Sequence, residues 1–91
     1  MVASVVNRFP ERELEIHRLC ARDPEFDGVC DDYGYALDVL HHWRSQGASG
    51  SVRAEEYRLI VAEMEEEILD RLKADIDKWA KVIERAGIAK Q

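Results

Sequence analysis

The sequence predicts an all-α protein in which a short N-terminal helix precedes a long antiparallel helical hairpin of the coiled-coil type. Charged residues make up 35% of the 91 residues, and Gly and Pro are few, a composition typical of helices and coiled coils. Apolar residues recur at 3–4 spacing in two long stretches, and a segment rich in Gly and Ser separates them. The length predicts one helical domain over residues 1–91.

The first part of the chain is expected to hold a flexible arm and one short helix. Residues 1–8 are expected to form the arm. Residues 10–22 predict a helix, because Pro10 suits a first turn and acidic residues follow it near the positive end of the helix dipole. Ile16, Leu19 and Cys20 give this helix an apolar patch at i, i+3, i+4 spacing.

The second helix is predicted over residues 24–45. Asp23 is a good N-cap and Pro24 a good first helical residue. With heptad position a set at residue 26, the a and d positions form an unbroken apolar series: Phe26, Val29, Tyr33, Ala36, Leu40 and Trp43. The residues that follow, 46–51, contain two glycines and two serines and predict the turn of the hairpin.

The third helix is predicted over residues 52–86, and it is longer than the second. The two helices should measure roughly 52 and 32 Å, so that folding them together places Pro24 beside about residue 72. Beyond that point Ile76, Trp79 and Ile83 have no partner on the second helix. They must pack on the first helix, pack on another chain, or stay exposed.

Association is the outcome that we expect, because a Trp–Ile stripe of this length is rarely left bare. Two hairpins forming a four-helix bundle is the simplest arrangement, and a homodimer is favoured. The residues expected at interfaces are Phe26, Tyr33, Leu40, Trp43, Ile76, Trp79 and Ile83.

A pair of adjacent histidines invites a metal-site interpretation. His41 and His42 fall at heptad positions b and c, outside the apolar series, in a last helical turn where the helix dipole favours cations. We therefore expect surface residues at a helix end. The alternative is a metal site built across chains, with Asp38 and His41 as an i, i+3 pair. The candidate ligands would be His17, Cys20, His41 and His42.

Charge and composition exclude several other classes. The net charge is −6, and the sequence has no run of Lys and Arg of the kind that indicates nucleic-acid binding. No apolar stretch is long enough to span a membrane. Cys20 and Cys30 do not form a disulfide framework, lie on apolar stripes and are expected in the core. A cytoplasmic setting is the default, no cofactor is expected, and no catalytic constellation is recognisable.

The stretch from residue 9 to about residue 72 resembles the YdcH-like family of small bacterial helical proteins of unknown function. The matching features are Phe9-Pro10, Ile16-His17, Leu19, Asp23, Phe26, Tyr33 and the "EIL" of Glu67–Leu69. Two departures are Glu65, where members often carry a lysine, and the extension beyond residue 72. The resemblance implies a helical hairpin and implies no activity.

The sequence therefore predicts a non-enzymatic helical-hairpin interaction module that self-associates. A further protein partner is expected either on the acidic outer face of the second helix or on the segment around Trp79. The alternative function is a small metal-binding or metal-responsive protein that uses its His and Cys side chains.

Overall fold

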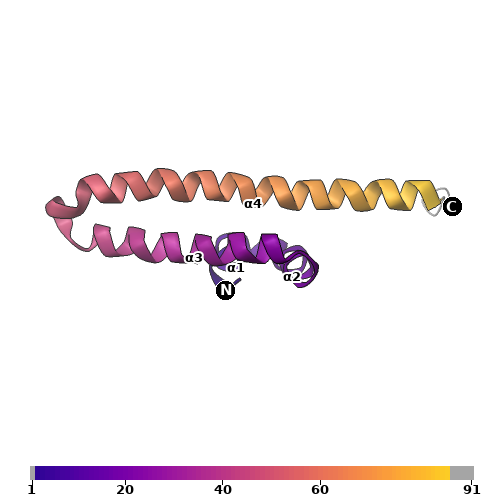
Figure 1. The fold of residues 1–91 in the computed structure, drawn as a ribbon, viewed down its shortest axis with the longest axis horizontal. Helices are drawn as coiled ribbons and strands as arrows, with labels where there is room; N and C mark the ends of the chain where they lie inside the picture. The colour runs from indigo at the N-terminus through magenta and orange to yellow at the C-terminus, as the bar shows by residue number, and fades with distance from the viewer. Residues whose placement is uncertain (1, 87–91) are drawn as a thin grey trace.

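The computed structural model of the chain describes residues 2–86, with side chains to Val82, and every element in that range is helical. Short N-terminal segments precede two long helices that lie side by side (Figure 1). The molecule is a rod with extents of 61 × 21 × 19 Å. The elements in chain order are α1 (Ala3–Arg8), η1 (Pro10–Arg12), α2 (Glu13–Arg22), α3 (Pro24–Arg44), η2 (Gly47–Gly50) and α4 (Ser51–Ala86).

Helices α3 and α4 form the body of the rod, because α3 runs antiparallel to the first half of α4 (Figure 1). Helix α3 has 21 residues and α4 has 36, so α4 continues far past the start of α3. The core between them and the N-terminal segments is apolar: Val5, Phe9, Ile16, Leu19, Phe26, Cys30, Tyr33, Ala36, Leu40, Val61, Ile68 and Leu72 are buried.

Local chemistry sets both ends of α3. At its start, the Asp23 carboxylate accepts hydrogen bonds from the backbone N–H groups of Glu25 and Phe26, as an N-cap does. At the turn, Gly47 adopts a φ of 63°, which glycine tolerates and most side chains do not. A Cβ at Gly50 would lie 2.2 Å from a backbone oxygen of α3, so the turn is closed by backbone contact.

The start of α3 lies beside residue 71 of α4. Glu25 Oε1 accepts from Arg71 Nη1 at 2.8 Å, and this ion pair fixes the point at which α4 leaves α3. The sequence argument from helix lengths placed Pro24 beside about residue 72. From there α4 extends beyond α3 to Ala86 (Figure 1).

The N-terminal segment differs from its prediction. Residues 2–8 were expected to belong to a flexible arm, but residues 3–8 form helix α1, and the Val5 side chain is fully buried. Burial is possible because α1 crosses α3 at Gly34, where a Cβ would lie 3.2 Å from Ser4 Oγ. Burial of its apolar face explains why so short a helix persists.

The other boundaries differ from the predictions by small amounts. The helix predicted over residues 10–22 begins as the 3₁₀ turn η1 and becomes α-helical at Glu13. Helix α3 ends at Arg44 rather than at residue 45, and α4 begins at Ser51 rather than at residue 52. Helix α2 lies against both α3 and α4, near the start of α3, where α4 begins to project beyond α3 (Figure 1).

Candidate interaction surface

An exposed apolar face lies on α4 beyond α3, in continuation of the buried face of the same helix. Ile76, Trp79 and Val82 are 44%, 48% and 46% exposed, although the preceding members of the same face, such as Leu72, are buried. Trp79 stands about five helical turns beyond Val61, so the two side chains project from the same side of a straight α-helix. The apolar face of α4 therefore continues after its cover ends. We call residues 73–86 the overhang.

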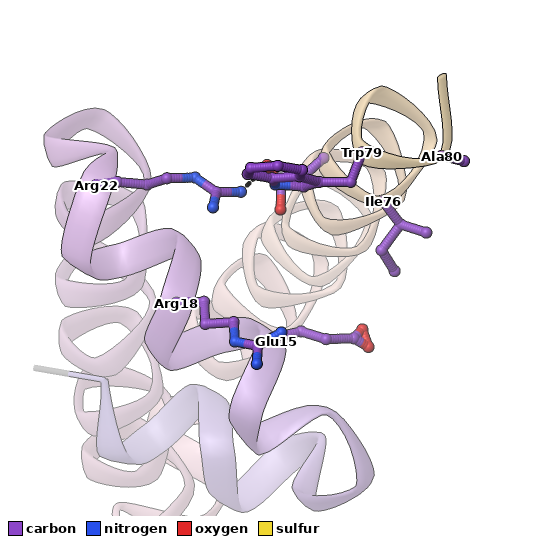
Figure 2. A pocket seen from close by; sticks show the side chains of 7 residues that line it. Glu15, Arg18, Arg22, Ile76, Trp79 and Ala80 are labelled. Carbon is purple, nitrogen blue, oxygen red and sulfur yellow. Dashed lines mark hydrogen bonds and ion pairs between the residues drawn. The ribbon is translucent and has the colours of Figure 1, made fainter. Parts of the chain in front are cut away.

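Helix α2 covers the root of the overhang through one side chain. Arg22 forms an ion pair with Asp75, and its guanidinium carbon lies 5.2 Å from the centroid of the Trp79 ring. Figure 2 shows Arg22 reaching from α2 across to Trp79 on α4. A cation over an indole face is attracted by the ring quadrupole, so Arg22 helps to orient the exposed ring.

Between α2 and the overhang lies an open groove of about 550 Å³, which we call the α2–α4 groove (Figure 2). Its α4 wall is mainly apolar and carries Ile76, Trp79 and Ala80, and its α2 wall carries charged side chains. The full lining is Glu15, Arg18, Arg22, Asp75, Ile76, Trp79 and Ala80. A surface with an apolar centre and a charged rim is typical of protein interfaces.

The charges of this groove are unequally paired. Glu15 pairs with Arg12 at 3.5 Å, and Arg22 pairs with Asp75. Arg18, by contrast, forms no ion pair with any residue between positions 2 and 82. The groove therefore presents one unpaired cation beside an exposed tryptophan.

The predicted interface residues fall into four groups. Phe26, Tyr33 and Leu40 are buried inside a single chain, because α1, α2 and α4 together enclose the inner face of α3. The structure therefore places these three in the core rather than at an interface between chains, which corrects the expectation. Trp43 is half-buried at the turn, where its ring meets Arg53 at 5.4 Å.

The third and fourth groups lie on the overhang. Ile76 and Trp79 are exposed, as an interface requires of a free chain. The side chain of Ile83 lies outside the described part of the structure. Sequence reasoning missed Arg18, Arg22 and Asp75, because the contact between α2 and α4 depends on the angle of the corner at Asp23–Pro24, which a linear pattern does not encode.

The candidate metal ligands lie on two different helices and in separate places. His17 and Cys20 belong to α2, whereas His41 and His42 are exposed in the last turn of α3, and Cys20 contacts Cys30, which lies about 16 Å of helix before His41. His17 Nε2 lies 3.7 Å from Glu13 Oε2, and Cys20 Sγ lies 3.8 Å from Cys30 Sγ. Among the described residues, no cluster of three or more His, Cys, Asp or Glu side chains could hold a metal ion.

The two cysteines pack against each other at the junction of α2 and α3. Cys30 is buried and Cys20 is half-buried, so the expectation that both belong to the core holds for Cys30 and partly for Cys20. Burial, together with the neighbouring thiol, raises the pKa of Cys30 to about 12, and burial also raises the pKa of Cys20. Both groups are held as thiols at neutral pH, which makes them poor nucleophiles and poor metal ligands.

One polar network joins three helices that lie far apart in the sequence. The Tyr33 hydroxyl donates to Glu65 Oε2 at 2.7 Å, and Arg8 Nε donates to the same oxygen at 3.1 Å. The network thus joins α3, α4 and α1 through one carboxylate. Burial raises the pKa of Tyr33 well above its usual range, and the hydrogen bond to the negatively charged Glu65 raises it further.

Comparison with known proteins leaves this surface without a precedent. No family model, curated protein or solved structure matches the chain. Within residues 2–86, none of the helices combines the length and the apolar character that crossing a bilayer requires. Any function must therefore be argued from the geometry itself.

Proposed function

We propose that this chain is a non-enzymatic helical-hairpin module that works by binding protein, and that its first partner is another copy of itself. The observation that carries the proposal is the exposed apolar face of Ile76, Trp79 and Val82 on the overhang of α4. These side chains continue the apolar face of α4 whose earlier members, Val61, Ile68 and Leu72, are buried in the core. Covering them removes apolar surface from water, which is the main driving force for association.

The remainder of the molecule supports a binding role rather than a catalytic one. The thiols carry raised pKa values, and the described residues bring no nucleophile, base and orienting group together. The resemblance to the YdcH-like family supports the hairpin and adds no chemistry. We place the module in the reducing cytoplasm, where Cys20 and Cys30 stay as thiols.

About three turns of α4 lie beyond its ion pair with α2 at Asp75, so the contact belongs to the small end of specific interfaces. We therefore expect a dimer that dissociates on dilution. Sedimentation velocity over about a hundredfold range of protein concentration should show the sedimentation coefficient rising with concentration.

A matched pair of variants identifies the surface. Trp79→Asp places a charge on the overhang face and should keep the chain monomeric throughout that range. Leu59→Asp is the control, because Leu59 is 52% exposed on the same helix but projects from the side opposite the apolar face. It should dimerise like the wild type. A wild-type chain that stays monomeric at every concentration would refute the proposal.

A further inference from the structure

We infer that the second copy pairs through its own overhang, placed antiparallel in the α2–α4 groove so that the two α4 helices overlap end to end. This inference rests on the proposed function, because it names the occupant and the orientation of the same surface. Its geometry follows from the place at which α3 stops. Arg71 pairs with Glu25 of α3, and Asp75 pairs with Arg22 of α2, so the free face of α4 begins near residue 76.

The free face and its proposed occupant have the same length. From residue 76 to Ala86, α4 offers about 16 Å of helix beyond its ion pair with α2, and the apolar side chains described there, Ile76, Trp79 and Val82, are half exposed. A second copy offers an identical free segment, which would run antiparallel to the first, as α3 does further along α4. Each overhang thus fills the space that its partner leaves, and the twofold axis passes near Ala80 and Lys81. A contact between two copies related by a twofold axis uses the same surface on both, so the assembly contains two copies and grows no further.

The register also brings the C-terminal end of the partner helix close to two arginines. In an antiparallel overlap, the C-terminal end of the partner α4 arrives at the base of the groove, where α2 carries Arg18 and Arg22. The last turn of a helix presents unsatisfied carbonyl groups and a partial negative charge. Arg22 is engaged with Asp75, but Arg18 is the unpaired cation of the described groove lining. Arg18 therefore lies where the free carbonyl groups of a helix C-terminus would need a hydrogen-bond donor.

The overlap resembles a helical bundle in cross-section. Each copy contributes α2 and α4, and the two α4 helices lie at the centre with one α2 flanking each side. Ala80 lies on the flank of the apolar face, where a small side chain lets the two helices approach closely. The pairing therefore buries both walls of the α2–α4 groove rather than one helix face alone.

Disulfide trapping tests the register. An Ala80→Cys chain, oxidised with copper phenanthroline, should give a covalent dimer on a non-reducing gel, because the two copies of residue 80 face each other near the twofold axis. Ala62→Cys is the matched control. Ala62 is also an exposed alanine of α4, it lies about five turns earlier on the same side of the helix, and it lies outside the overlap. It should stay monomeric on the gel, as should the oxidised wild type.

A second measurement tests the role of Arg18. Arg18→Glu should raise the dimer dissociation constant by about tenfold, which corresponds to 1.4 kcal/mol. The control is Arg44→Glu, because Arg44 is an exposed arginine at the far end of α3, and this variant should leave the dissociation constant unchanged.

The outcomes separate this inference from the proposed function. The antiparallel overlap is wrong, and the proposed function stands, if the chain dimerises and Trp79→Asp abolishes the dimer but Ala80→Cys cross-links no better than Ala62→Cys. If the chain never dimerises, both are wrong.

Discussion

The hydrogen bond from Tyr33 to Glu65 should be a principal polar contribution to stability, and Tyr33→Phe measures it. The phenylalanine ring keeps the packing of the buried tyrosine and removes only the hydroxyl, which donates to the carboxylate at 2.7 Å. A hydrogen bond to a charged group contributes about 1.5–3 kcal/mol. Glu65 keeps its second donor, Arg8, and its side chain is 21% exposed, so the lower end of that range applies.

We therefore expect Tyr33→Phe to lower the free energy of unfolding by about 1.5 kcal/mol, or the melting temperature by about 6–12 °C for a domain of this size. Thermal and urea unfolding followed by circular dichroism provide the assay, at one fixed protein concentration because association shifts apparent stability. The control is Tyr35→Phe, two residues away on α3, where the side chain is 71% exposed. Equal losses from the two variants would refute the assignment.

Arg8 offers an internal comparison within the same network. Its ion pair with Glu65 is exposed on the arginine side, where the side chain is 54% accessible, and exposed ion pairs contribute little to stability. Arg8→Met should therefore cost less than Tyr33→Phe.

Three other predictions test the packing. The pKa of Cys30 is raised to about 12 from 9.0, so the thiol of the unfolded chain loses its proton at lower pH than the thiol of the folded chain. The free energy of unfolding should therefore be unaffected below pH 9 and should fall by up to about 1.4 kcal/mol per pH unit above it. Urea unfolding at a series of pH values measures this fall. The raised pKa of Tyr33 acts in the same direction above pH 10, and a flat alkaline profile would contradict both assignments. Gly50→Ala should lower the free energy of unfolding by about 1–3 kcal/mol through overpacking of the turn. Gly28→Ala adds a methyl group with no atom within 4 Å, so it should raise the free energy of unfolding by up to about 1 kcal/mol in the same assay. Val5→Ala should cost about 1.5 kcal/mol in thermal unfolding, and no loss would mean that α1 is not packed in solution.

Periodicity predicted the long helices because their burial follows it directly. The a and d series of α3 is buried or half-buried at every member, from Phe26 to Trp43. The exposure of His41 and His42 followed from the same register. The position at which α4 outgrows α3 could be predicted because helix length depends only on residue number. Each of these inferences uses a one-dimensional pattern that a helix preserves in space.

The N-terminal helix was missed although its pattern was present. Val2, Val5, Val6 and Phe9 stand at i, i+3, i+4 and i+7, and all four are buried or half-buried. Valine lowers helix propensity, and an isolated helix of six residues is unstable, so local reasoning favours an arm. The tertiary contact at Gly34 reverses that balance. The same limit applies to the α2–α4 groove, which exists only after α2 has turned at Pro24.

The length of α4 sets a distance as well as a surface. The turn η2 lies at one end of a molecule that is 61 Å long, and the overhang lies at the other (Figure 1). Two copies that share about 16 Å of helix would therefore form a strut of about 100 Å with its two turns pointing in opposite directions. Trp43 and Arg53 would be displayed at both tips. Such a strut would hold its two turns at a fixed separation, and dilution of the protein would release one copy from the other.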